Sequence, residues 1–209
     1  MDTEMFDRWS QIGVAVAALL SGAWFVIKKM LPYIRRKRAA KSEELFNQIN
    51  MRIWEVLSEL RIKTKASRVS LTQFHNGGKF SNGGSMRKMS ITHQTCENKV
   101  PSTMQFRQDV LVSRYVEIVQ MLQDNDSNRR MVSSLYDCNS KKFYELHDTL
   151  SFSMLPVYCN DSLLVNGYIS IEWCDFGTID NLDDKMVESL FETARDQVAY
   201  LVHSLKEYR

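Results

Sequence analysis

The chain has 209 residues and a formal net charge of +2, so its overall charge points to no particular partner. Four cysteines form no CxxC pair and have no paired histidines nearby, which argues against a zinc site: Cys96, Cys138, Cys159 and Cys174. They would form disulfides only in an oxidising compartment, and the sequence does not determine their pairing. The chain contains no GxSxG, HExxH or phosphate-binding glycine loop. We therefore expect no enzyme activity, no cofactor and no metal.

An uncharged stretch of 16 residues, Ile12 to Ile27, lies near the N-terminus. As a helix it rises roughly 24 Å, and with its flanking residues it can cross a hydrocarbon core of about 30 Å. Trp9 and Tyr33 stand where interfacial aromatic residues are expected. The alternatives are a signal peptide and a buried core helix, but a signal peptide begins with basic residues, and this chain begins with acidic ones. We predict a tail over residues 1–11 and a membrane-spanning helix over residues 12–31.

A basic collar over residues 32–41 follows the predicted anchor. Between Lys28 and Lys41 there are seven basic residues and no acidic one. Such a segment suits anionic lipid head groups, and the positive-inside rule places it in the cytoplasm. A nucleic-acid arm is the alternative, but Tyr33 is the only aromatic residue in this stretch. We expect membrane lipid as a partner and no nucleic acid.

The remaining residues, 42–209, number about 165, which is enough for one soluble domain with its own core. Residues 41–64 are predicted as a helix whose apolar residues form either a short heptad seam or the buried face of a domain helix: Phe46, Ile49, Ile53, Val56 and Leu60. Hydrophobic alternation predicts strands over residues 68–74, 86–94, 131–138, 152–159 and 163–174, and a helix over 105–123. A final helix is expected from Asp180 or Asn181 onward. The order predicts an α+β domain with an antiparallel sheet flanked by helices.

The hairpin near the C-terminus carries a first resemblance. A proline-bearing strand, Ser153 to Val157, is followed by a polar turn and by the glycine-led strand Asn166 to Ile171. This pattern resembles GAF- and PAS-like sensor domains. Within the hairpin we predict Gly167 at a bulge or a close strand contact, and Glu172 on an exposed strand face.

The best candidate for a ligand or partner site is a glycine-containing segment in the first half of the domain. Its predicted site residues are Phe74, His75, Asn76, Gly77 and Phe80. A histidine and an asparagine beside flexible backbone can bind a polar ligand, and the two phenylalanines can pack against its sides. The alternative is a tight turn whose asparagine bonds its own backbone.

A second resemblance covers most of the chain. Together with the single anchor and short tail, four segments are similar to the T-holin family, the lysis holins of T-even phages: residues 99–103, 155–159, 167–173 and 188–190. The resemblance implies a bacteriophage holin that oligomerises in the host inner membrane and forms lesions that release an endolysin for host cell lysis. It also implies a periplasmic domain that binds an antiholin, although the charge bias indicates the opposite topology. Homo-oligomers would form through small residues on one face of the anchor: Gly13, Ala17 and Ser21.

Two other functions compete with this interpretation. One is a membrane-tethered GAF-like protein that senses a ligand or regulates a partner. The other is a structural membrane protein of a virion or of a membrane complex.

Overall fold

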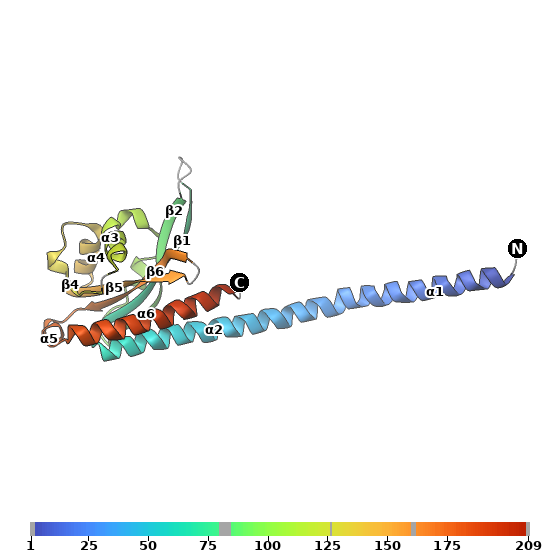
Figure 1. The fold of residues 1–209 in the computed structure, drawn as a ribbon, viewed down its shortest axis with the longest axis horizontal. Helices are drawn as coiled ribbons and strands as arrows, with labels where there is room; N and C mark the ends of the chain where they lie inside the picture. Colours follow the sequence, from blue (N-terminus) through green and yellow to red (C-terminus); the bar gives the residue numbers. More distant parts are fainter. Residues whose placement is uncertain (1–2, 80–84, 126, 160–161, 208–209) are drawn as a thin grey trace. The chain divides into compact units, whose positions relative to one another are not determined.

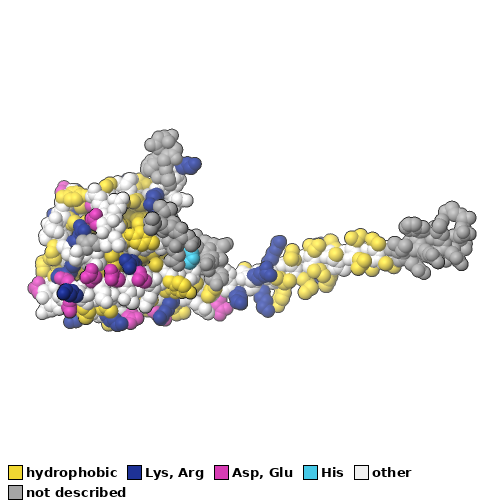
Figure 2. Space-filling view, viewed as in Figure 1, with side chains coloured by type: hydrophobic (Ala, Val, Ile, Leu, Met, Phe, Trp, Pro, Cys, Tyr) yellow, Lys and Arg dark blue, Asp and Glu magenta, His cyan; other side chains and the backbone are white. Residues whose placement is uncertain are grey.

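The computed structural model describes residues 3–79, 85–125, 127–159 and 162–207. The chain divides into two compact units, residues 1–48 and 49–209. Unit 1 contains α1 (Thr3–Phe25), a π-helical turn (Val26–Met30) and the start of α2 (Leu31–Lys63). Within the described part, one helix is long and apolar enough to cross a membrane, and its apolar stretch is unburied. Figure 2 shows hydrophobic side chains along this helix and lysine and arginine side chains gathered next to them.

Unit 2 is built on a six-stranded sheet with the order β3-β2-β1-β6-β5-β4 (Figure 1). All neighbouring strands pair antiparallel. The strands are β1 (Arg68–Lys79), β2 (Ser85–Cys96), β3 (Val110–Leu111), β4 (Arg130–Met131), β5 (Ser151–Cys159) and β6 (Ser162–Trp173). The helices of this unit are the end of α2, then α3 (Val116–Asp124), α4 (Asn139–Leu146), α5 (Phe176–Ile179) and α6 (Asp184–Glu207). The predicted α+β domain with an antiparallel sheet is confirmed.

Helices cover both faces of the sheet, with α2 and α6 on one face and α3 and α4 on the other (Figure 1). The α2 face is marked by hydrogen bonds from Ser58 and Arg61 to Thr95 of β2. The opposite face, which we call the inner face, packs against a core of buried residues from the sheet, α3 and α4: Met89, Ile118, Met121, Leu122, Val132, Leu135, Phe143, Tyr144, Phe152, Met154 and Tyr168. Because side chains alternate along a strand, the inner face of β1 carries Arg68, Ser70 and Thr72.

The predicted helical faces are largely confirmed. In α2, Ile49, Ile53, Val56 and Leu60 are buried, whereas Phe46 is 42% exposed, so this seam is the buried face of a domain helix from Ile49 onward. In α6 the buried positions include Val187, Phe191, Ala194, Val198 and Val202. The helix begins at Asp184, and the Asp183 carboxylate accepts hydrogen bonds from the first-turn amides, so the predicted cap at Asp180 or Asn181 is wrong.

Three element predictions need correction. Strand β1 continues to Lys79 instead of ending at Phe74. The predicted helix over 105–123 forms only as α3; the residues before it form a 3-10 turn (Met104–Phe106), β3 and a second 3-10 turn (Val112–Arg114). The predicted strand over 131–138 is limited to β4, and α4 lies in a stretch for which no helix is predicted. All three errors lie where tertiary contacts, rather than periodicity, set the backbone.

Candidate functional site

The segment predicted as a ligand site lies along the β1–β2 hairpin. Phe74 packs against the inner-face core, with its ring centroid 6.0 Å from that of Tyr168. The Nε2 atom of His75 lies 2.9 Å from the Ser90 hydroxyl, and Asn76 is exposed. A Cβ atom on Gly77 would meet Lys88 Cγ at 2.7 Å, and Phe80 lies outside the described residues. Of the described members of this set, only Phe74 belongs to the core of the inner face.

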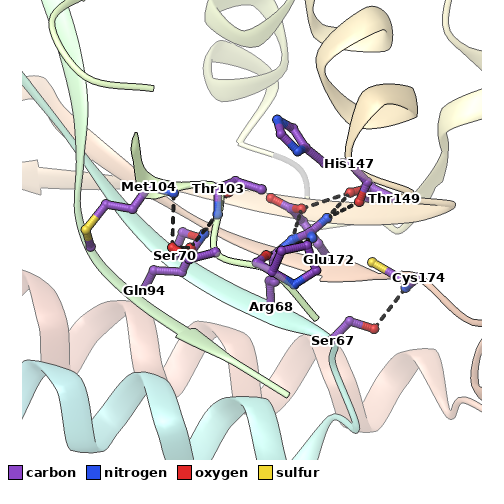
Figure 3. A network of polar contacts seen from close by, with 12 residues as sticks. Ser67, Arg68, Ser70, Gln94, Thr103, Met104, His147, Thr149, Glu172 and Cys174 are labelled. Carbon is purple, nitrogen blue, oxygen red and sulfur yellow. Dashed lines mark hydrogen bonds and ion pairs between the residues drawn. The ribbon is translucent and has the colours of Figure 1, made fainter. Parts of the chain in front are cut away.

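A buried polar network occupies one end of the inner face (Figure 3). Arg68 Nε donates to Glu172 Oε2 at 2.9 Å, and the two side chains are 0% and 3% exposed. The remaining guanidinium nitrogens donate to the Pro101 and His147 carbonyls and to the Thr149 hydroxyl, which in turn donates to Glu172. The prediction that Glu172 lies on an exposed strand face is therefore wrong. Its buried charge is compensated by an arginine on the neighbouring strand.

A second buried arginine, Arg107, reaches the inner face from a segment that lies along β2. Residues 101–108, which we call the strap, carry this side chain, and Arg107 is 1% exposed. Its Nη1 donates to the Tyr168 hydroxyl at 3.1 Å. Its guanidinium carbon lies 3.9 Å from the ring centroid of Phe143, 5.1 Å from that of Tyr115 and 5.7 Å from that of Tyr144. Burial by itself lowers the pKa of Arg107, but Tyr168, Tyr144 and Glu172 raise it, and the net shift is upward. The guanidinium is therefore cationic.

The hydrogen bonding of Arg107 is incomplete, unlike that of Arg68. Neither Nε nor Nη2 of Arg107 has a hydrogen-bond partner among the described residues, although both atoms are buried. The buried Thr72 hydroxyl and His147 Nε2 also lack partners in the part of the chain that the structure describes. Thr72 pairs with Tyr168 across β1 and β6, so the two side chains lie on the same face of the sheet. Buried polar atoms are normally satisfied in folded proteins, so this concentration of unsatisfied ones marks the interior around Arg107 as the candidate site.

Side-chain and backbone hydrogen bonds hold the strap on the sheet, including one from the Ile91 amide to the Arg107 carbonyl at 2.9 Å. Gln94 on β2 donates to the hydroxyls of Ser70 and Thr103, and its carbonyl accepts from the Ser102 hydroxyl and the Thr103 amide (Figure 3). Gln108 adds hydrogen bonds to the carbonyls of Ile91 and Met104. An open groove runs along the strap and β2, lined by Ile91, Thr92, Pro101, Ser102, Met104, Gln105 and Gln108. Polar contacts that water can replace therefore hold the segment that carries Arg107.

Histidine, cysteine and acidic side chains do not assemble into a metal site in the described ranges. Cys96, Cys138 and Cys174 are free thiols, and burial raises the pKa of Cys96 and of Cys174. Burial, together with the positive charge of Arg68, lowers the pKa of His147. The candidate site thus consists of one cation, aromatic rings, a hydroxyl and a neutral imidazole.

Comparisons with known proteins identify the fold. Neither a family model nor a curated protein matches the chain. Solved structures do match: a phycocyanobilin-bound GAF domain from a cyanobacterial phytochrome is 14% identical with a TM-score of 0.53, covering 79% of this chain and 96% of that one. A far-red cyanobacteriochrome photoreceptor is 11% identical with a TM-score of 0.54, and the match covers 83% of this chain and 99% of that one. The GAF domain of a two-component sensor histidine kinase from Bacillus halodurans is 15% identical, TM-score 0.50, with 74% and 95% covered. At these identities the likeness establishes a GAF-like fold.

The holin prediction is wrong. The similar structures reported above come from photoreceptors and a sensor kinase, and none of the three is a holin. The segments that suggested the T-holin family, such as residues 155–159 and 167–173, lie in the β5–β6 hairpin, whose alternation the GAF-like sheet explains. Host cell lysis, an endolysin and an antiholin were expected only from that family and are not carried forward.

Proposed function

We propose that this chain is a membrane-tethered GAF-like sensor whose domain interior receives a small ligand. The observation that carries the proposal is Arg107, a buried cation on the inner face with two unsatisfied nitrogens. A residue that serves stability alone would have its donors paired, as Arg68 has. Binding sites combine such converging polar groups with apolar and aromatic walls, and Arg107 is surrounded by Tyr115, Phe143 and Tyr144.

The ligand is smaller than the phycocyanobilin of the phytochrome GAF domain. In this chain the space between the sheet and α4 is filled by large side chains, since Tyr144 and Tyr168 are 0% exposed and Arg107 is 1% exposed. Burial raises the pKa of Tyr144 strongly, so its hydroxyl stays protonated. A compact molecule that replaces part of this packing fits such an interior better than a tetrapyrrole.

The N-terminal unit supplies the membrane attachment in this proposal. The uncharged stretch spans the bilayer, and the basic residues that follow it contact anionic lipid. The same basic bias supports a cytoplasmic location for the domain. In that location a fluorescent protein fused to the C-terminus would fluoresce, and alkaline phosphatase fused there would be inactive. Self-association through Gly13, Ala17 and Ser21 belongs to the same proposal, because small residues permit close helix approach.

The test is a thermal-shift screen of the full chain in nanodiscs against anionic, neutral and cationic small molecules. We expect at least one compound to raise the melting temperature of the wild type and of Tyr200→Phe, an exposed control. The same compound should have a smaller effect on Thr72→Val, which alters only the interior. Absence of any stabilising compound, together with native mass spectra free of a co-purified molecule, would reject a sensor with an interior ligand.

A further inference from the structure

We propose that the ligand is an oxyanion, a carboxylate or phosphate group on a compact molecule, held by the Nε–Nη2 edge of Arg107. This inference rests on the proposed function and adds the chemical class of the ligand.

The two unsatisfied nitrogens form one side of the guanidinium. Nη1 donates to the Tyr168 hydroxyl, whereas Nε and Nη2 of Arg107 lack hydrogen-bond acceptors in the described part of the chain; the Tyr144 hydroxyl, which also has no hydrogen-bond partner there, lies close enough to interact with the guanidinium. Their two N–H groups run parallel, and the planar fork matches two oxygens of one carboxylate or phosphate. A neutral ligand with a single acceptor atom would leave one of these buried donors unsatisfied, which is unfavourable.

The other buried arginine of the domain shows what satisfies such donors. In Arg68, Nε donates to the carboxylate of Glu172 at 2.9 Å, and Nη2 donates to the His147 carbonyl at 2.8 Å. Arg107 is as deeply buried as Arg68 but has no carboxylate partner within the described residues. An added anion would supply the counter-charge, whereas an added cation would be repelled at short range. Charge therefore selects an anion for this interior.

The surroundings of Arg107 define the rest of the ligand. Phe143, Tyr115 and Tyr144 present aromatic rings within 6 Å of the guanidinium carbon. The Thr72 hydroxyl and the Nε2 atom of His147 add unsatisfied polar atoms on the same face. A small apolar or aromatic body carrying the oxyanion would pack on these rings, and a hydroxyl or carbonyl on it would meet the polar atoms.

Entry requires the strap to move, because the edge of Arg107 is closed to solvent. The contacts that must open are the hydrogen bonds of Gln94 to the strap, the bond from Gln108 to the Ile91 carbonyl, and the backbone bond from the Ile91 amide to the Arg107 carbonyl. Ile91 and Gln108 also line the groove along the strap and β2, and we expect the ligand to enter from this side. Binding is therefore expected to be slow relative to diffusion.

Isothermal titration calorimetry on the full chain tests the inference, in nanodiscs of neutral phosphatidylcholine so that no anionic lipid competes. The probes are formate, acetate, benzoate, inorganic phosphate and phenyl phosphate, with benzamide and benzylamine as the neutral and cationic counterparts of benzoate. We expect at least one oxyanion to bind, and comparing the affinities of the phosphates and the carboxylates shows which group the site prefers. We expect benzamide and benzylamine to bind at least tenfold more weakly than the oxyanion.

Two substitutions locate the binding. Arg107→Lys keeps the charge but removes the fork, and should weaken the oxyanion at least tenfold. Arg129→Lys alters an arginine paired at the surface with Asp184, and should leave the affinity unchanged. If Arg107→Lys does not fold by near-ultraviolet circular dichroism, the comparison of benzoate with benzamide on the wild type still decides the question.

Three results would overturn the inference: equal binding of benzoate and benzamide, equal binding by wild type and Arg107→Lys, or binding of no oxyanion in the panel. If the thermal-shift screen meanwhile yields a neutral or cationic interior ligand, the proposed sensor function stands and only the oxyanion class is lost. If neither experiment yields any ligand, both are rejected.

Discussion

Replacing each of the two buried arginines by methionine tests which of them stabilises the fold. Arg68→Met removes one partner of an ion pair whose side chains are 0% and 3% exposed. Two unit charges about 4 Å apart attract by roughly 4 kcal/mol at an effective dielectric constant of about 20. Removing the arginine leaves the Glu172 carboxylate buried and uncompensated, so we expect a loss of about 3–5 kcal/mol in the free energy of unfolding.

Arg107→Met should behave differently, because gains and losses nearly cancel. The substitution removes the hydrogen bond to Tyr168, worth about 1 kcal/mol, and ring contacts worth roughly 0.5–2 kcal/mol. It also removes two buried donors without acceptors in the described residues, each of which costs about 1–3 kcal/mol. Methionine packs well against aromatic rings. We therefore expect Arg107→Met to lower the free energy of unfolding by no more than about 1 kcal/mol.

The assay is urea unfolding of the full chain in nanodiscs, followed by the fluorescence of the buried Trp173, with melting temperatures as a second readout. For a domain of this size a loss of 3–5 kcal/mol lowers the melting temperature by about 6–20 °C. Arg129→Met, at an exposed pair, serves as the control and should cost no more than about 1 kcal/mol. Similar large losses for Arg68→Met and Arg107→Met would refute the reasoning, since Arg107 would then be a structural residue.

Three further outcomes follow from the structure. Gly167→Ala should cost about 3 kcal/mol in urea unfolding, because its Cβ would meet the Thr72 carbonyl and lie 2.9 Å from Gln73 Cα; a loss no larger than that of Gly177→Ala would contradict the tight β1–β6 contact. Gln94→Leu should raise hydrogen–deuterium exchange of residues 101–108, since it removes four side-chain hydrogen bonds, and unchanged exchange would show that the strap is held by other contacts. The pKa of His147 is lowered, so its contribution is complete above the unfolded pKa of about 6.5 and is lost as the pH falls below it; His147→Phe should reduce the fall in stability between pH 7 and pH 5, and an unaltered slope would exclude His147 as its source.

The parts of the fold predicted from sequence are those with local periodicity. The β5–β6 hairpin follows from alternation around Pro156 and Gly167, and the buried faces of α2 and α6 follow from helical spacing. Of the two alternatives predicted for Gly167, a bulge or a close strand contact, the pairing with Gln73 confirms the close contact. These elements account for the β5–β6 hairpin and for the buried faces of the two long helices that pack on the sheet.

The candidate site could not be predicted in the same way because its contacts are non-local. Glu172 alternates with Ile171 and Trp173, a pattern that suggests an exposed position, but its partner Arg68 lies 104 residues away in sequence. Arg107 falls in a stretch whose spacing resembles a helix, and its partner Tyr168 is 61 residues distant. The one feature of the sequence that indicates a buried polar residue is a charge within an otherwise apolar strand. This feature identifies Glu172 but not Arg107.

The guanidinium of Arg107 itself provides the most direct test of the central claim. In the full chain labelled with nitrogen-15 arginine, the Arg107 Nε–H resonance is assigned by its disappearance in Arg107→Lys, and the oxyanion that binds tightest is then added. We expect this resonance to shift downfield and its hydrogen exchange to slow, because a new charged acceptor reaches the Nε–Nη2 edge, while the Nε–H of Arg68, already bonded to Glu172, stays unchanged. An unmoved Arg107 resonance at saturating oxyanion, or equal shifts at both arginines, would contradict an interior ligand site at Arg107.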